Sequence, residues 1–312
     1  MKLLSVIVPC FNEEEAIPYF CEAFKDTRKT FQERWPEVSI ELLFIDDGSK
    51  DKTLELIKNL SKEDKSIRYV SFSRNFGKEA GLLAGLEHAR GDYLVCMDVD
   101  LQDPPSLLPD MFEAVYVDGY DSAATRRVTR QGEPPIRSFF ARRFYRLMNK
   151  ISTAEIVDGA RDYRVMTRQM AEAILSMGEY SRFTKGIYGW IGFKTKWFEF
   201  ENVERIAGET KWSFWNLFRY AIEGIVAFST KPLEIIAGLG ATVSFGSFIY
   251  LIVSLVFFCR GAWDLKPVLA ALILLCTGVL LLALGIISFY LSKTYLETKR
   301  RPVFIVKEKS EE

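Results

Sequence analysis

The sequence predicts an α/β domain with a mostly parallel sheet, followed by a hairpin of two transmembrane helices. In the first third of the chain, short apolar runs rich in β-forming residues alternate with helical patterns. Nearer the C-terminal end, two long stretches contain no charged residue. Hydrophobic residues make up 49% of the 312 residues, which is more than a soluble enzyme requires.

The α/β prediction comes from four apolar segments, since strands that are buried on both faces of a parallel sheet carry few polar residues. These segments are residues 3–9, 40–46, 68–73 and 92–100. Helices are predicted between them, near 14–34, 52–62 and 78–89, with Gly91 as a C-cap of the third. Repeated strand-helix-strand units favour a parallel sheet, whose ligands bind in the loops after the carboxyl ends of the strands.

The two uncharged stretches, residues 235–259 and 267–292, are predicted to cross a membrane. Each has about 25 residues and would reach roughly 37 Å as a helix, enough for a hydrocarbon core of about 30 Å. The connection at 260–266 allows only a hairpin, so both ends of the chain are expected on one side. Basic residues after the second stretch place that side in the cytoplasm. They are Lys293, Lys299, Arg300, Arg301 and Lys307.

This pattern divides the chain into a cytoplasmic domain at 1–230, the hairpin at 231–292 and a basic cytoplasmic tail at 293–312. Within the first domain, segments near 137–150 and 212–228 mix aromatic and basic residues at helical spacing. Such segments are either ordinary core helices or interfacial helices that bind membrane lipid and hold the domain against the bilayer.

Residue usage argues against several kinds of site. The five cysteines never fall at CxxC spacing and the only histidine is His88, so thiolate zinc sites, haem and histidine-based catalysis are poorly supported. Neither a P-loop nor a dinucleotide fingerprint occurs, and no nucleic-acid partner is expected. The stretch 126–150 carries eight Lys or Arg residues against Glu133 alone, which suits an anionic membrane surface or a phosphate ligand.

An apolar run ends in three aspartates in YLVCMDVDLQDPP, residues 93–105. In an extended chain Asp98 and Asp100 project to the same side, where their carboxylates repel unless a cation lies between them. A divalent ion, Mg²⁺ or Mn²⁺, fits that position, with Gln102 as a further oxygen ligand. The alternative is that these acids only face water at a strand end. Asp103, before Pro104, fits a turn as well as catalysis.

The other predicted strand ends allow local roles as well as a shared site. Asn12 fits a helix N-cap with Glu15 at the capping-box position, and Ser49 or Asp51 fits the cap of the next helix. Because these polar clusters follow neighbouring strands, together they are typical of a nucleotide site.

Several motifs, in order along the chain, resemble those of family-two glycosyltransferases that act on polyprenyl phosphate, and bacterial bactoprenol-phosphate glucosyltransferases in particular. They are VIVPCFNEEEAI, FIDDGSKDKT, SRNFGKEAGLLAGL, MDVDLQDPP, ARDYRVMTR, RIAGETKWSFW and TYLETKRRPVFIV. The resemblance covers nearly the whole chain. It implies the Rossmann-like nucleotide-diphosphosugar transferase fold, a UDP-sugar donor, a divalent metal cofactor (Mg²⁺ or Mn²⁺) and undecaprenyl phosphate as acceptor. It also implies a multi-pass protein of the bacterial inner membrane.

Carried over residue by residue, the resemblance assigns four groups. The nucleotide-sugar residues are Pro9, Phe11, Glu13, Asp47, Lys78 and Asp98, and the metal ligands are Asp98, Asp100 and Gln102. The catalytic residues are Asp162, in RDYR, and Asp100, and the acceptor-phosphate residues are Arg205, Lys211 and Arg127. Attraction to the membrane surface is the alternative for Lys211 and the arginines. The related motif often reads GDFR, so Arg161 is a departure that changes the pocket beside Asp162.

The implied reaction moves a hexose from UDP to the lipid phosphate in one inverting displacement, with glucose as the first choice and N-acetylglucosamine as the second. A phosphate monoester has a second pKa near 6 and is mostly dianionic at pH 7, so it needs no strong general base. Asp162 is therefore expected to orient the acceptor or to stabilise positive charge at the anomeric carbon.

Two other functions share part of these features. A processive polysaccharide synthase would need more membrane helices and a QxxRW motif, which this sequence lacks. A non-catalytic membrane scaffold would not need the acidic cluster. For the favoured function, the product is expected to serve cell-envelope glycan modification, with a flippase and a second glycosyltransferase downstream. The oligomeric state stays open, and a homo-oligomer is allowed.

Overall fold

The computed structural model describes residues 2–127, 157–200, 225–259 and 266–310, with isolated residues at 143, 146, 149, 150 and 222. It divides into two compact units, one comprising Met1–Ala221 with Pro302–Glu312 and the other Ile222–Arg301. Most residues of the predicted helices near 137–150 and 212–228 lie outside the described residues.

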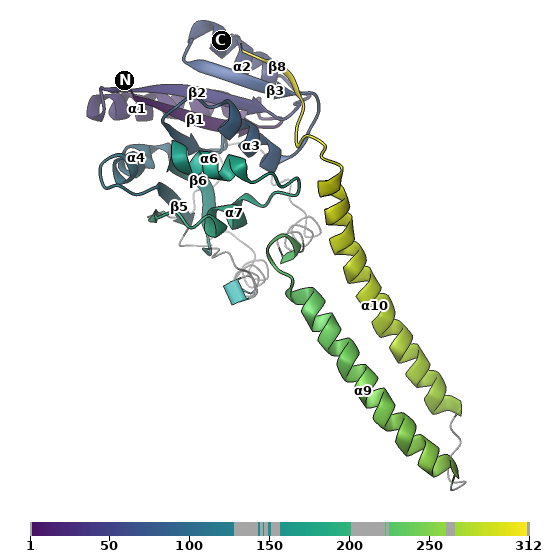
Figure 1. Ribbon diagram of the computed structural model, residues 1–312. Helices are drawn as coiled ribbons and strands as arrows, with labels where there is room; N and C mark the ends of the chain where they lie inside the picture. The colour runs from purple at the N-terminus through teal and green to yellow at the C-terminus, as the bar shows by residue number, and fades with distance from the viewer. Residues whose placement is uncertain are drawn as a thin grey trace. The chain divides into compact units, whose positions relative to one another are not determined.

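The described part of the first unit is built on an eight-stranded sheet in the order β7-β5-β6-β4-β1-β2-β3-β8. Figure 1 shows β1, β2 and β3 next to one another in this sheet. Parallel pairing joins β1 to β2 and β4, β2 to β3, and β5 to β7. In contrast, β6 runs antiparallel between β4 and β5, and β8 runs antiparallel beside β3. The predicted α/β class with a mostly parallel sheet is confirmed. The strands are β1 (Lys2–Cys10), β2 (Val38–Asp46), β3 (Ile67–Phe72), β4 (Tyr93–Cys96), β5 (Ser122–Arg127), β6 (Ala160–Thr167), β7 (Thr195–Phe200) and β8 (Val306–Lys309).

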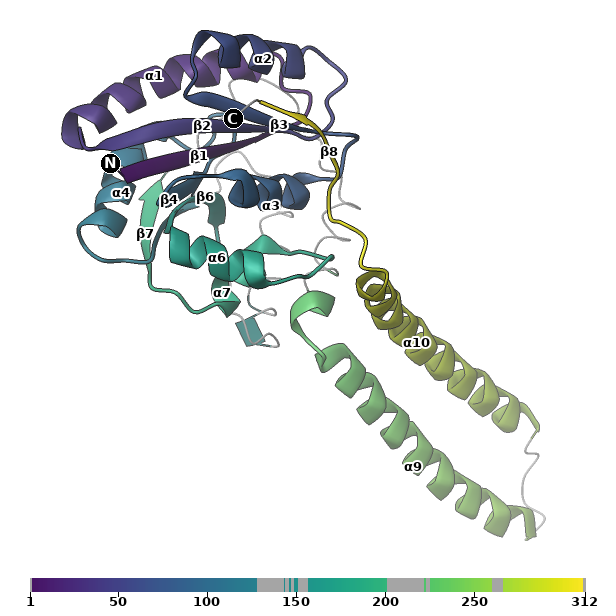
Figure 2. The same ribbon diagram turned by 45° about the horizontal axis from the view of Figure 1, so that its top comes forward.

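Helices cover both faces of this sheet. On one face α1 and α4 contact each other, and on the other α3 and α6 do so. Figure 2 shows α1 and α2 above the sheet and α3 and α6 below it. Crossover connections between parallel strands are right-handed, so the return from β3 to β4 puts α3 opposite α1. The helices of this unit are α1 (Ala16–Arg34), α2 (Thr53–Glu63), α3 (Lys78–His88), α4 (Leu108–Tyr116), α6 (Arg168–Ser176) and α7 (Thr184–Trp190).

The central strands are buried as the apolar runs predict. Leu43, Phe44 and Ile45 of β2 are fully buried. On the α1 and α4 side, the ring of Phe112 meets the rings of Phe31 and Tyr93 edge-on, with centroids 4.9 and 5.2 Å apart. This packing makes the sheet a firm support for the loops at its carboxyl edge.

The predicted strand at 92–100 is shorter in the structure, because β4 ends at Cys96. The chain then turns, and Leu101 adopts the left-handed conformation with φ 55°. Asp98 and Asp100 therefore lie in a turn rather than on one side of an extended strand.

Gly91 is not a helix cap, since α3 ends at Ala89 in an extended conformation. A Cβ added at Gly91 would lie 2.7 Å from the carbonyl oxygen of Leu3. This position requires glycine because two backbone segments approach closely there.

The second unit consists mainly of two long helices that lie side by side, α9 (Lys231–Cys259) and α10 (Lys266–Thr298). Within them, Lys231–Tyr250 and Leu275–Thr298 are long and apolar enough to span a membrane. Large apolar side chains are exposed along both helices; Phe245 is 68% exposed and Leu281 is 65% exposed. An apolar surface of this extent suits a hydrocarbon environment, and the predicted pair of apolar helices is confirmed.

The segment predicted as the end of a basic tail instead forms β8 at the edge of the sheet. Ser73 donates its backbone N–H to the carbonyl of Ile305 at 3.0 Å, and Ser310 donates to Tyr69 at 3.0 Å. The ring of Phe304 stacks on Phe72, with centroids 4.9 Å apart. VKEK, despite its charges, has the alternation of a half-exposed edge strand.

Replacement of Phe304 tests this docking. Phe304→Ala should lower the thermal midpoint of the full chain in detergent by about 2–6 °C, because a half-buried aromatic stack is lost. Ile305→Ala is the matched control, since its side chain is 52% exposed and the carbonyl that binds Ser73 remains. Equal losses for the two variants would contradict a specific role of the stack.

Candidate active site

The loops after β1, β2, β3 and β4 lie along one edge of the sheet, because these neighbouring strands are parallel. The antiparallel strand β6 begins at the same edge. Cys96 at the end of β4 pairs with Arg164 of β6, so the loop after β4, which carries Asp98, lies beside the start of β6, which carries Asp162. The fold therefore brings together acids that are distant in the sequence.

The first two loops are joined by hydrogen bonds, and Asp51, one of the predicted caps, also accepts the N–H of Thr53, the first residue of α2, at 3.1 Å. Asn12 has φ 52°, and its side-chain oxygen accepts the Lys50 N–H at 2.8 Å. Ser49 accepts the Asn12 N–H at 3.0 Å, and Asp51 accepts the Glu14 N–H at 3.2 Å. Glu15, the residue before α1, caps that helix with no side-chain hydrogen bond. The polar residues of these loops thus hold the loops to each other.

Asp47 fixes the loop that leads into α3. Its two carboxylate oxygens accept the N–H groups of Phe76 and Gly77 at 2.6 and 2.9 Å. Burial raises the pKa of Asp47, and these two hydrogen bonds act against that rise. Gly48, at φ 66°, lies so close to the Arg74 backbone that an added Cβ would be 2.4 Å from its carbonyl carbon. These contacts position Lys78, the first residue of α3.

Lys78 joins a carboxylate of the loop after β4 to a carboxylate of β6. Its Nζ lies 2.8 Å from Asp98 Oδ2 and 2.6 Å from Asp162 Oδ2. The Asp98 and Asp162 side chains are 21% and 15% exposed. Burial alone raises the pKa of Asp162, but Lys78, Lys185 and Arg161 outweigh it and hold that pKa well below its usual range. Asp162 is therefore an ionised group at neutral pH.

Arg161, the departure from the related motif, makes an ion pair inside the protein. Its Nε donates to Asp103 Oδ1 at 2.9 Å, and the Asp103 side chain is fully buried. A second guanidinium N–H donates to Gln102 Oε1 at 3.4 Å. Burial raises the pKa of Asp103 to about 6, while the positive charge of Arg161 acts in the opposite direction. Arg161 thus restrains the turn that carries the aspartates.

The predicted metal ligands lie in this turn. Asp100 is 9% exposed and one of its oxygens accepts the Gln102 N–H at 3.2 Å. Across the described residues, no three His, Cys, Asp or Glu side chains are grouped to hold a metal ion. Two carboxylates nevertheless fit Mg²⁺, which is commonly held by one or two carboxylates together with substrate phosphates. Gln102 is the weaker candidate, because its oxygen faces a donor from Arg161.

The remaining predicted residues fall on both sides of this cluster. Pro9, the last residue but one of β1, lies beside α3, with its Cβ 3.4 Å from a Cβ built at Gly81. Phe11 and Glu13 are half-buried in the loop after β1, and Arg127 is half-buried at the end of β5. The Arg127 N–H donates to the carbonyl of Gly159 at 3.0 Å, next to the start of β6. Arg205 and Lys211 lie outside the described residues.

Sequence reasoning missed the contacts that α7 makes near the site. Glu79 accepts the Thr184 N–H at 2.9 Å and also accepts a hydrogen bond from the Thr184 hydroxyl. Lys185, the next residue, adds positive charge near Asp162. No spacing in the sequence links these residues to α3, since they lie more than 100 positions apart.

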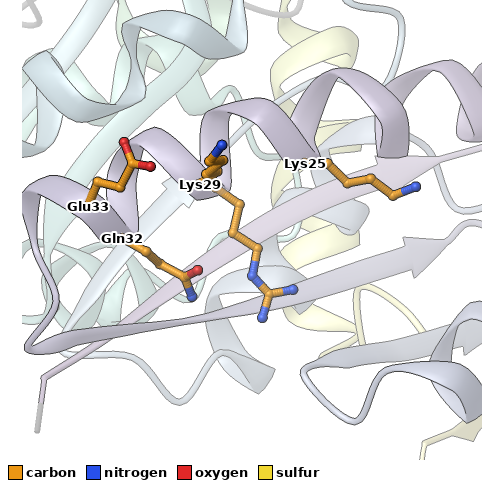
Figure 3. A pocket seen from close by; sticks show the side chains of 5 residues that line it. Lys25, Lys29, Gln32 and Glu33 are labelled. Atoms are coloured by element: carbon orange, nitrogen blue, oxygen red, sulfur yellow. The ribbon is translucent and has the colours of Figure 1, made fainter.

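A surface hollow of about 350 Å³ lies elsewhere, on α1. Its lining side chains all come from the later turns of that helix (Figure 3). Because α1 starts at the carboxyl edge of the sheet and runs away from it, the hollow is remote from the aspartates. Its residues are Lys25, Arg28, Lys29, Gln32 and Glu33.

A comparison with models of protein families identifies the family to which this chain belongs. Residues 5–175, which include every acid of the cluster, match the model of glycosyl transferase family 2. The chain belongs to this family. It is a glycosyltransferase, as the motifs of the sequence predict.

Relatives of this glycosyltransferase match it over almost its whole length. The prophage bactoprenol glucosyl transferase homolog of Escherichia coli (strain K12) is 40% identical, covering 97% of this chain and 98% of the relative. The bactoprenol glucosyl transferase of Shigella phage SfV is 41% identical over the same two shares. A crystal structure of glucosyl-3-phosphoglycerate synthase from Mycobacterium tuberculosis aligns with a TM-score of 0.46 and 18% identity, covering 72% of this chain and 78% of that one.

Removal of the Arg161 charge should destabilise the transferase. Arg161→Met leaves Asp103 buried without a cation, which should cost about 3–5 kcal/mol of unfolding free energy. Arg161→Lys, which keeps the charge, should cost less. In a double-mutant cycle by urea unfolding, Asp103→Asn combined with Arg161→Met should lose less than the sum of the single variants. Strictly additive losses would show that the two side chains do not interact.

Proposed function

We propose that this glycosyltransferase moves glucose from UDP-glucose to undecaprenyl phosphate, with inversion at the anomeric carbon. The observation that carries the proposal is the similarity to relatives named bactoprenol glucosyl transferase, which extends over the aspartate cluster and both apolar helices. A lipid acceptor also suits a chain whose long helices expose apolar side chains.

The donor would bind in the loops after β1 and β2. Pro9, Phe11 and Glu13 would line the nucleotide, and Asp47 would contribute by holding the loop before Lys78 in place. Asp98 and Asp100 would hold the divalent ion. When bound, such an ion stabilises negative charge on the departing UDP oxygen as a Lewis acid.

Asp162 would act as an anion rather than as a base. Its pKa is held low by Lys78 and other cations against the effect of burial, so it takes up a proton poorly at neutral pH. The acceptor phosphate, mostly dianionic at pH 7, needs no base. Asp162 would therefore orient the acceptor through bound cations or stabilise positive charge on the anomeric carbon.

The acceptor phosphate would lie near cations beside the start of β6. Arg127 is in that region, and Arg205 and Lys211 complete the proposed set. The two apolar helices would form a hairpin across the bacterial inner membrane, with the sheet domain on the cytoplasmic side, because basic residues follow α10. A flippase and a second glycosyltransferase would then use the glycolipid.

N-acetylglucosamine is the second candidate sugar. The observation that favours it is Arg161, whose pairing with Asp103 and Gln102 gives the pocket beside Asp162 a different lining from the glycine of the related motif.

The central experiment incubates membranes that contain the protein with undecaprenyl phosphate and a panel of UDP-sugars. Mass spectrometry should find a hexosyl lipid phosphate with UDP-glucose, and EDTA should abolish it. Asp100→Asn should lower transfer about 100-fold or more, because charge on the leaving group loses its stabilisation. Asp118→Asn, the same change at a surface ion pair with Lys196, should leave transfer unaltered. If no donor yields a glycolipid, the proposal is wrong.

The role of Asp162 is tested by the pH dependence of transfer. A carboxyl whose pKa is depressed stays ionised until the pH falls far below 4, so it cannot produce a limb between pH 5 and 9. Asp162→Asn should therefore lower the rate at every pH in this range and leave the shape of the profile unchanged. An acidic limb that is present in the wild type and absent in Asp162→Asn would make Asp162 a base.

A further inference from the structure

We infer that Lys78 is a built-in counter-cation, which occupies the carboxylate of Asp98 in the donor-free enzyme and gives it up when a metal ion arrives with a nucleoside diphosphate. The inference rests on the proposed function, because it takes a metal and a diphosphate to be the ligands. In this inference Lys78 exchanges the carboxylate of Asp98 for the diphosphate, whereas the sequence predicts only that Lys78 contacts the nucleotide sugar.

The geometry places Lys78 where a cation is required. Asp98, in the loop after β4, and Asp162 of β6 share the Lys78 ammonium as a partner, and neighbouring carboxylates repel unless a positive charge lies between them. The Lys78 ammonium lies within 2.8 Å of one and 2.6 Å of the other. Two of its three N–H donors are thereby used, which leaves one for a further anion.

A divalent ion at Asp98 would compete with this ammonium. Both are cations that bind the same carboxylate, and they would repel each other at the short distance that shared binding demands. A metal ion alone therefore binds Asp98 against the repulsion of Lys78, which favours release of the contact between Lys78 and Asp98. When a diphosphate binds at the same time, the ammonium gains a new anionic partner and keeps Asp162 as its second anchor.

The exchange couples the two ligands. Binding of the diphosphate should strengthen metal binding, and by thermodynamic reciprocity the metal should strengthen diphosphate binding by the same factor. A side chain of the enzyme thus makes the site take up both ligands together rather than the metal by itself.

The experiment measures Mn²⁺ binding to the purified full chain in detergent, by the electron paramagnetic resonance signal of free Mn²⁺, with and without UDP. Lys78→Met should bind Mn²⁺ without UDP about tenfold more tightly than the wild type, because one charge-assisted contact no longer opposes the metal. The enhancement by UDP should fall by a similar factor. Lys78→Arg, which keeps a bridging cation, should resemble the wild type.

Lys185→Gln is the matched control. It removes one positive charge whose effect reaches Asp162, but Lys185 has no hydrogen bond or ion pair with Asp98 or Asp162 among the described contacts. Its Mn²⁺ affinity without UDP should change much less than that of Lys78→Met. Thermal unfolding of each variant establishes that it is folded.

Three results would overturn the exchange: equal tightening by Lys78→Met and Lys185→Gln, no tightening by Lys78→Met, or loss of coupling in Lys78→Arg alone. The proposed function fails separately. Wild-type protein that transfers glucose without binding Mn²⁺ or Mg²⁺ would remove the metal from the mechanism and the exchange with it. Coupled Mn²⁺ and UDP binding without any glycolipid product would support the exchange and reject the acceptor.

Discussion

The antiparallel pairing of β4 with β6 is the constraint on which the site depends. Cys96 pairs with Arg164, which brings the loop after β4, with Asp98, to the start of β6, with Asp162. Neighbouring carboxylates repel unless a cation lies between them, and the Lys78 ammonium supplies it at 2.8 and 2.6 Å. A charge pattern assembled from α3, the β4 turn and β6 therefore exists before any ligand binds.

The position of Lys78 depends in turn on the loop after β3. Asp47 holds that loop through the N–H groups of Phe76 and Gly77. Phe72, the last residue of β3, meets the ring of Phe76 edge-on at 5.8 Å and the ring of Phe304 in a stack at 4.9 Å. Packing thus continues from the C-terminal segment through β3 to the loop before Lys78, so β8 supports the site as well as the edge of the sheet.

The two units of the chain have side-chain surfaces that suit different solvents. In the sheet unit, charged groups near the carboxyl edge are paired, as Arg161 with the fully buried Asp103 illustrates, because an unpaired buried charge is costly. In the other unit, large side chains such as Phe245 and Leu281 are exposed along long helices, which suits hydrocarbon. One chain therefore carries both a cluster of paired charges at the edge of a sheet and an exposed apolar surface along two long helices.

The sequence by itself determined the elements that local pattern controls. The apolar runs predicted the bounds of β1, β2 and β3 to within two residues. The length of the two uncharged stretches predicted α9 and α10, and the order of the motifs indicated the family. Asp98, Asp100 and Asp162 were recognisable because their neighbours in the sequence form motifs. The end of β4 was misplaced, because the turn at Leu101 depends on a left-handed backbone that the apolar pattern does not encode.

Only the tertiary structure decided which of these residues meet. The bridge from Lys78 to Asp98 and Asp162, the pairing of Arg161 with Asp103, and the docking of β8 against β3 join residues separated by 20 to more than 200 positions. Short charged segments such as VKEK are compatible with a solvated tail or with an edge strand, and only an available partner strand selects between them. Contacts between distant segments depend on strand order and register. A local sequence pattern shows which face of a strand or helix is buried, but it does not show which other segment packs against that face.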